Sequence, residues 1–113
     1  MSAITTHVLD TARGRPAAGV GVRLERREGA DWRTIAERIT DADGRVRDLL
    51  PDGAPAATGV HRLVFATGAY HTASGATAFF PEVVVTFEIR DPAAHHHVPL
   101  LLSPYGYTTY RGS

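Results

Sequence analysis

Apolar and polar residues alternate over short segments of this chain, and this two-residue period is the feature that most constrains its fold. In Glu82–Ile89 the odd-numbered positions are all apolar, and the even-numbered positions are polar except for Val84. Val20–Arg26 alternates in the same way, and Val60–Thr67 and His96–Leu102 are also rich in strand-forming residues. Because alternate side chains of a strand point to opposite faces, the pattern predicts several half-buried β-strands.

Turn signals separate these segments at short intervals. Glycine, proline and aspartate occur together at residues 14–16, 41–44, 51–53 and 91–92. Ser103-Pro104-Tyr105-Gly106 lies between two strand-like segments and is typical of a hairpin turn. Many short strands with frequent turns predict an all-β sandwich or barrel. At 113 residues the chain has room for one domain, residues 1–113, which is small enough to benefit from association between subunits.

One segment, Asp31–Thr40, fits two kinds of structure. Trp32, Ile35, Ala36 and Ile39 follow the i, i+3, i+4 and i+7 spacing of an amphipathic helix. The alternation expected of a strand is also present there, although Glu37 interrupts it. The all-β context favours a strand, and we predict one. A short helix is predicted instead at about Thr67–Ser74.

Composition excludes several classes of function. The chain has no cysteine, so disulfides, thiolate metal sites and cysteine nucleophiles are all excluded. Twelve basic and twelve acidic residues cancel, so we expect neither a nucleic-acid nor a membrane partner. No apolar stretch approaches the ~20 residues of a membrane span, and the first residues do not resemble a secretory signal. We therefore expect a cytoplasmic protein.

The six histidines are the most reactive side chains available. His61 and His71 have their ordinary interpretation as surface or structural residues. His95-His96-His97 fits either a solvated strand start or a functional cluster, because His95 and His97 project from the same face of a strand. Those two could bind zinc or copper with a third ligand, but no carboxylate stands at a recognisable ligand spacing. We predict no metal site.

Three further positions are candidates for chemistry, each with an ordinary alternative. His7, in Ile4–Asp10, lies on the face opposite Ile4 and Val8, where a solvated polar residue would also fit. Arg45 follows a turn, where a solvated arginine is common. The final Tyr110-Arg111-Gly112-Ser113 could be a frayed tail, but its composition is unusual for one.

No cofactor site is apparent in the sequence. It contains no G-x-S-x-G elbow, no phosphate-binding glycine loop and no dinucleotide fingerprint. Lysine, asparagine and glutamine are absent, so a catalytic polar group must come from other side chains or the backbone. An enzyme of this composition would activate water by histidine and would need no cofactor.

Four blocks of the sequence resemble the 5-hydroxyisourate hydrolases of the transthyretin-like family. The blocks are THVLDTARGRPAAGVGVRL (Thr6–Leu24), TDADGRVRDLL (Thr40–Leu50), FFPEVVVTF (Phe79–Phe87) and HVPLLLSPYGYTTYRGS (His97–Ser113). Together they cover essentially the whole chain. The Tyr-Arg-Gly-Ser ending is the most specific element, because true transthyretins share the Leu-Leu-Ser-Pro-Tyr hairpin but lack this ending.

The resemblance implies a fold, an assembly and a reaction. The fold is a transthyretin-like sandwich of two antiparallel four-stranded sheets with one short helix. The assembly is a homotetramer, a dimer of dimers with active sites at the interface between dimers. The reaction belongs to urate and purine breakdown: water opens the six-membered ring of 5-hydroxyisourate to give 2-oxo-4-hydroxy-4-carboxy-5-ureidoimidazoline, without a metal.

The resemblance also implies the residues of the site. The implied catalytic residues are His7, Arg45, His97 and Ser113, and the implied substrate-binding residues are His7, Arg45, Tyr110, Arg111 and Ser113. One of the two histidines would deprotonate water while the other orients it or moves the proton, and the sequence leaves their order open. Arg45 would stabilise the oxyanion. Ser113, with a free α-carboxylate, would hydrogen-bond substrate or a histidine.

Two other functions stay open at this point. The first is a transthyretin-like protein that binds a small hormone-type ligand, which the set of polar residues at His7, Arg45 and His97 argues against. The second is a metal-binding protein that uses His95 and His97. A test for hydrolysis of 5-hydroxyisourate distinguishes both from the enzyme.

Overall fold

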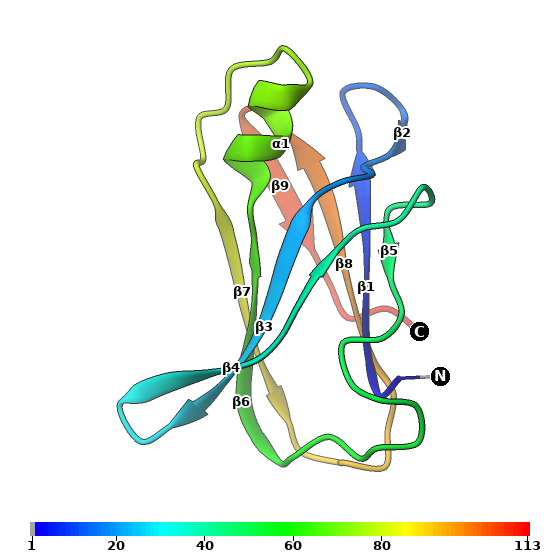
Figure 1. Ribbon diagram of the computed structural model, residues 1–113, viewed down its shortest axis with the longest axis vertical. Coiled ribbons are helices and arrows are strands. Elements are labelled where there is room, and N and C mark those ends of the chain that lie inside the picture. Colours follow the sequence, from blue (N-terminus) through cyan, green and yellow to red (C-terminus); the bar gives the residue numbers. More distant parts are fainter. Residues whose placement is uncertain (1) are drawn as a thin grey trace.

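Two β-sheets packed face to face form the body of the protein (Figure 1). The computed structural model describes residues 2–113. The first sheet contains β1 (Ile4–Asp10), β2 (Arg15–Pro16), β5 (Arg45–Val46), β8 (His96–Ser103) and β9 (Gly106–Thr109). The second sheet has the order β4-β3-β6-β7 and contains β3 (Gly21–Glu28), β4 (Asp31–Ile39), β6 (Gly59–Phe65) and β7 (Val83–Ile89). The all-β sandwich predicted from the sequence is confirmed.

The first sheet differs in two ways from the expected four antiparallel strands. It has five strands, because β2 and β5 divide one edge of β1 between them. β2 pairs with Leu9 and Asp10, whereas β5 pairs with Thr6 and His7. In addition, β1 and β8 run parallel. These two strands lie far apart in the chain and are joined through the second sheet, so no hairpin forces them to be antiparallel.

The segment that also fitted a helix is a strand, β4. It pairs antiparallel with β3, and the register shifts between Leu24 and Glu25, where Leu24 faces Ala36 and Glu25 faces Thr34. This β-bulge leaves Ile35 as the extra residue. One extra residue shifts the two-residue alternation by one position, so side chains beyond the bulge point to the opposite face from the one that the earlier pattern predicts. The bulge therefore explains why the apolar positions in this segment do not alternate regularly.

One short helix, α1 (Thr67–Ala73), lies where the sequence predicted it. It follows β6 and covers one end of the sandwich (Figure 1). Its Tyr70 hydroxyl donates a 2.6 Å hydrogen bond to the buried carboxylate of Asp10, which ties the helix to the end of β1. Within residues 2–113, no helix is long and apolar enough to cross a membrane.

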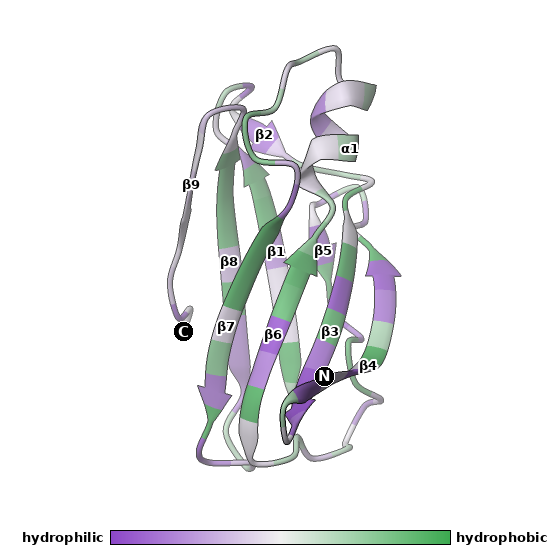
Figure 2. Ribbon diagram, turned by 90° about the vertical axis from the view of Figure 1, so that its left-hand side faces the viewer, coloured by the Kyte–Doolittle hydropathy of each residue, from purple (hydrophilic) through white to green (hydrophobic). Residues whose placement is uncertain are grey.

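The core lies between the sheets and consists mainly of apolar side chains from the strands, together with residues of the connecting segments such as Leu49 and Ala56. Apolar and polar residues follow one another along the strands in Figure 2. Ile4, Val8, Leu100 and Leu102 of the first sheet are almost completely buried in the core, as is Phe65 of the second. Burial of one such side chain stabilises a fold by about 1.5–3 kcal/mol. The side chains at the intervening positions of β1 and β8 face outward, where they are free to form a site.

The turn before β5 depends on a glycine. Gly44 has a positive φ of 76°, and a Cβ there would lie 2.3 Å from the carbonyl oxygen of Val8. The Gly44 carbonyl in turn accepts a 2.7 Å hydrogen bond from the Val8 N–H. The turn thus lies directly against β1, and only a residue without a side chain allows this approach.

We predict that Gly44→Ala destabilises the protein much more than Gly14→Ala. Gly14 has a similar φ of 68° but open space around its missing Cβ. Gly14→Ala should therefore cost only the conformational strain, roughly 1–2 kcal/mol, whereas Gly44→Ala adds a collision with backbone. Urea unfolding of both variants measures the difference. Equal losses of stability would contradict the close packing of this turn on β1.

Candidate active site

The parallel pairing of β1 with β8 brings the N-terminal and C-terminal histidines together. In this ladder Thr5 lies opposite His97 and His7 lies opposite Pro99. On the other side of β1, His7 lies opposite Arg45 of β5. Three strands from distant parts of the sequence therefore meet at one place, on the face of the first sheet that points away from the core.

Thr5 holds two imidazole rings at once. Its Oγ1 lies 2.7 Å from Nδ1 of His97 and 3.0 Å from Nε2 of His95. The rings of the two histidines are nearly parallel, with an interplanar angle of 16° and centroids 6.2 Å apart. Thr5 itself is 6% exposed. The orientation of His97 is therefore fixed by a buried hydroxyl, and Nε2 is the ring nitrogen left for substrate.

His7 is oriented by the turn before β5. Its Nε2 lies 2.8 Å from the backbone carbonyl oxygen of Asp43. A carbonyl only accepts hydrogen bonds, so Nε2 carries the proton and Nδ1 is the nitrogen left unprotonated in the neutral ring. The same turn precedes Arg45, whose backbone N–H donates a 2.9 Å hydrogen bond to the side-chain carboxylate of Asp41.

A cavity of about 210 Å³ opens beside these groups. Its lining residues are Thr5, Thr6, Arg45, Arg47, His95, His97 and Ser113. Two guanidinium groups and two imidazoles in one small cavity favour a planar substrate with several carbonyl oxygens, because guanidinium groups donate paired hydrogen bonds to such oxygens.

The cavity keeps His97 in its neutral form. Burial lowers the pKa of His97, and the charge of Arg45 lowers it further, with smaller contributions from the neighbouring rings of His95 and His7. A hydrogen bond to the Thr5 backbone opposes this effect in part. A neutral imidazole with one free nitrogen can accept a proton from water, so His97 has the properties of a general base.

The C-terminal tail reaches the cavity by passing close to His97. It runs from β9 past β8 toward β5 (Figure 1), and the Gly112 N–H donates a 2.8 Å hydrogen bond to the His97 carbonyl. A Cβ on Gly112 would lie 2.5 Å from the His97 ring. This contact explains the glycine in the tail and places Ser113 in the cavity wall.

Tyr110 and Arg111 do not line this cavity. They border a different hollow, of about 230 Å³, together with Phe87, His96 and other residues of β7 and β8. His97 lines both spaces. Of the six residues predicted for the site, Arg45, His97 and Ser113 line the cavity and His7 lies opposite Arg45 on the neighbouring strand, whereas Tyr110 and Arg111 lie on the other side of the tail.

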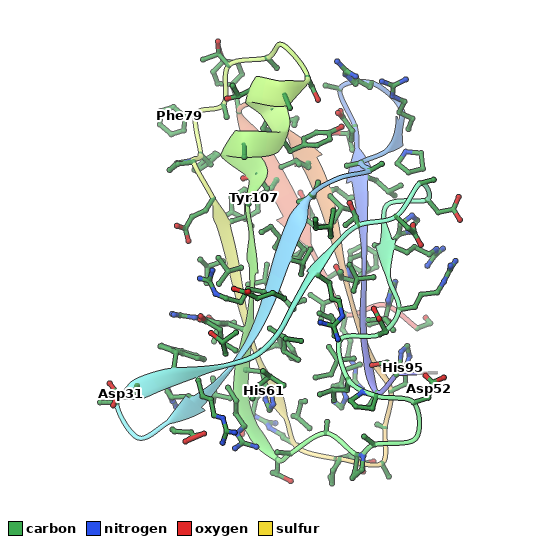
Figure 3. The ribbon with its side chains drawn as sticks, in the orientation of Figure 1. Asp31, Asp52, His61, Phe79, His95 and Tyr107 are labelled. Carbon is green, nitrogen blue, oxygen red and sulfur yellow. The ribbon has the colours of Figure 1, made fainter. Side chains whose placement is uncertain are left out.

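The remaining histidines, His61, His71 and His96, are buried, which selects among the interpretations open for them from the sequence. His96 is not part of a solvated strand start: it is 5% exposed, faces the core, and its Nδ1 has no hydrogen-bond partner among residues 2–113. His61 and His71 are buried too, so neither is a surface residue. His61 stacks on Phe87 between the sheets (Figure 3), whereas Nε2 of His71 also lacks a partner within the described chain.

Thr5 and Arg47 were not predicted as site residues from the sequence, and His95 was not predicted to belong to the catalytic site. The sequence did contain a signal for Thr5 and His95, because Thr5 shares a strand face with His7, and His95 shares one with His97. Nothing in the sequence singled out Arg47. In the part of the chain that the structure describes, no group of three or more histidine, cysteine or acidic residues is arranged to hold a metal ion.

The chain is similar to known proteins in both sequence and fold. A sequence model of the HIUase/Transthyretin family matches residues 4–112. A protein of Caulobacter vibrioides described as 5-hydroxyisourate hydrolase is 52% identical over 117 residues that cover 100% of both chains. The solved structure of Klebsiella pneumoniae 5-hydroxyisourate hydrolase has a TM-score of 0.85 at 38% identity, covering 97% of this chain and 92% of that one.

A transthyretin has the same fold. Sea bream transthyretin in complex with thyroxine has a TM-score of 0.89 at 33% identity, covering 98% of this chain and 95% of that one. Because a hydrolase and a thyroxine-bound protein share this fold, the backbone alone does not separate the two functions. The two functions therefore have to be distinguished by the side chains around the cavity.

We predict that the free energy of unfolding falls as the pH decreases from 7 to 5. Burial lowers the pKa values of His61 and His96 below the ordinary histidine value. The unfolded chain therefore binds more protons than the folded one below about pH 6.5. Each of these two buried rings contributes at most about 1.4 kcal/mol per pH unit.

Urea unfolding at several pH values measures this slope. His61→Phe keeps an aromatic ring against Phe87 but removes one titrating group, so its slope should be smaller than that of the wild type. A stability that is the same at pH 7 and pH 5 would show that these histidines take up protons in the folded state as readily as in the unfolded chain.

Proposed function

The chain belongs to the HIUase/Transthyretin family and is a 5-hydroxyisourate hydrolase, and we propose that His7, His97 and Arg45 catalyse this reaction around the cavity of about 210 Å³. One observation carries the assignment of the residues. A half-buried histidine with a lowered pKa and an arginine line one open cavity, and a second, oriented histidine lies opposite that arginine on the neighbouring strand. This set matches the needs of amide hydrolysis.

Hydrolysis of the substrate is the opening of a cyclic amide. Water adds to a carbonyl carbon of the six-membered ring of 5-hydroxyisourate, the carbon–nitrogen bond breaks, and the leaving nitrogen takes a proton. The site must therefore supply a base for water, a positive group for the oxyanion and a proton for the nitrogen. No metal or cofactor has a role in this scheme.

His97 is the base in our proposal. Its lowered pKa favours the unprotonated form, and Thr5 occupies Nδ1, so Nε2 receives the proton of water. His7 orients the water or the substrate through Nδ1, because its Nε2–H is held by the Asp43 carbonyl. Arg45 stabilises the negative charge on the carbonyl oxygen in the transition state.

The tail completes the cavity. We assign substrate contact to Ser113, whose position in the cavity wall supports it. Tyr110 and Arg111, which line the neighbouring hollow, act by anchoring the tail instead of touching substrate. This modifies the role expected for them from the family resemblance and keeps them necessary for activity.

The alternative is a binding protein for a hormone-type ligand, favoured by the likeness to thyroxine-bound transthyretin. The charged cavity argues against it, because Arg45, Arg47 and two imidazoles suit a polar substrate. An absorbance assay separates the two functions: 5-hydroxyisourate is generated from urate with urate oxidase, and added protein either speeds its disappearance or does not.

We propose further that the enzyme is a homotetramer. Edge strands β7 and β9 are available for pairing, and apolar side chains beside them are exposed, Phe79 by 68% and Tyr107 by 42% (Figure 3). Light scattering should give four times the mass of the chain, and dilution to monomers should abolish turnover. A fully active monomer would contradict this assembly. The cytoplasmic location expected from the sequence stays a prediction.

Substitution of the three proposed catalytic residues should inactivate a folded enzyme. We predict that His7→Asn, His97→Asn and Arg45→Ala each lower kcat/KM by ~10² or more, as is typical for acid–base groups and oxyanion donors. Arg90→Ala, at an exposed ion pair with Glu88, is the control and should keep full activity. Activity and melting temperature are measured for all four. Full activity in His97→Asn would remove it as the base.

The tail has its own matched pair of variants. Gly112→Ala should lower kcat/KM at least ~10-fold, because its Cβ would push the tail or the His97 ring out of place. Gly106→Ala, in the nearby hairpin, has its closest neighbour at 3.8 Å and should be active. If the two variants hydrolyse 5-hydroxyisourate equally well, close contact between the tail and His97 is not needed.

A further inference from the structure

Two histidines share one hydroxyl group at the edge of the cavity. Thr5 Oγ1 lies within hydrogen-bonding distance of both His97 Nδ1 and His95 Nε2. A hydroxyl has one proton to donate and lone pairs to accept with. With one proton, the hydroxyl can donate to only one of the two nitrogens, so at least one ring must donate to it if both bonds form. When the hydroxyl donates to one ring and accepts from the other, one facing nitrogen carries a proton and the other does not.

This constraint couples the protonation of the two rings. When His97 carries its proton on Nδ1, it donates to Thr5, and Thr5 donates to His95. His97 Nε2 is then a free base. Three protons can shift by one place each: one from water to His97 Nε2, one from His97 Nδ1 to Thr5, and one from Thr5 to His95. After this shift His95 Nε2 carries a proton and His97 Nδ1 does not. His97 then carries its proton on Nε2 and is an acid at the same position in the cavity.

We propose that Thr5 and His95 are positioning residues that form a proton relay with His97. This inference rests on the proposed function and extends it. As water attacks the carbonyl carbon, His97 Nε2 takes its proton, the Nδ1 proton of His97 moves to Thr5 Oγ1, and the hydroxyl proton of Thr5 moves to His95 Nε2. His95 then holds the positive charge.

The relay reverses when the carbon–nitrogen bond breaks. His95 returns its Nε2 proton to Thr5, Thr5 returns its proton to His97 Nδ1, and His97 gives the Nε2 proton to the leaving nitrogen. The hydroxyl group of water ends on the carbonyl carbon, and one proton, equivalent to the one that water lost, ends on the leaving nitrogen. The enzyme therefore gains and loses no proton over the reaction. One ring can thereby serve as both base and acid.

The surroundings of the two rings suit these roles. His97 is half-buried beside Arg45 and His7, where a positive charge on it is unfavourable. His95 is exposed and borders the loop of residues 53–55, so water can solvate a charge there (Figure 3). Moving the charge from His97 to His95 takes it from a half-buried ring to an exposed one, where water solvates it better.

The first test measures the coupling without any substrate. Nitrogen-15 NMR of the histidine rings reports which nitrogen carries the proton, and a pH titration reports the charge. In the wild type we expect one dominant tautomer of His97, with the proton on Nδ1. Thr5→Val keeps the shape of the side chain but removes the hydroxyl, so it should mix the tautomers and uncouple the two titrations. Unchanged tautomers and titrations in Thr5→Val would overturn the relay.

The second test is kinetic. Thr5→Val and His95→Gln should each lower kcat ~10-fold or more with little change in KM, and should shift the pH profile. The glutamine amide reaches Thr5 but cannot hold an extra proton. Thr5→Ser restores the hydroxyl and should restore kcat. Thr11→Val is the control, because its hydroxyl donates to Leu102 and joins the end of β1 to β8 far from the cavity.

The outcomes separate the relay from the function it serves. If the wild type hydrolyses 5-hydroxyisourate and Thr5→Val or His95→Gln keeps its kcat and pH profile, the relay is wrong and the proposed function stands. If the wild type does not hydrolyse it, the proposed function is wrong. The NMR comparison then decides by itself whether Thr5 couples the two rings.

Discussion

Parallel pairing between β1 and β8 is the interaction on which the rest of the structure depends. Seven consecutive residue pairs join the two strands, from Ile4 opposite His96 to Asp10 opposite Leu102. The inward half of this ladder supplies much of the core, including Val8 and Leu100. The outward half holds the proposed catalytic histidines. Stability and chemistry thus share one pair of strands, and the two-residue period keeps them on opposite faces.

This division explains how one fold serves both a hydrolase and a thyroxine-binding protein. The core between the sheets does not involve the groups around the cavity, so those groups can differ while the backbone is kept. The groups around the cavity depend on local features of this chain: an arginine after a tight turn, histidines on the outer face, and a tail whose Gly112 lies against the His97 ring. The close contacts at Gly44 and Gly112 bring the turn and the tail to the same strands.

The sequence predicted more of the fold than of the site. The alternation in Glu82–Ile89 predicted β7 almost to the residue, because burial of one face of a strand makes every second residue apolar. Family resemblance supplied His7, Arg45, His97 and Ser113, which are gathered in space. It did not supply Thr5, because a threonine in a strand is ordinary and its importance comes only from the two rings that meet it.

The sequence by itself determined the strands, the short helix, the turns and the family, since each depends on residue order over short distances or on whole blocks of it. Only the tertiary structure decided which strands are neighbours, and therefore that Thr5 touches His95 and His97 across some 90 residues of chain. It also decided that His96 is buried while its neighbour His97 faces the cavity. Contacts between residues distant in the chain arise when the sheets close around their core, and no local pattern encodes them.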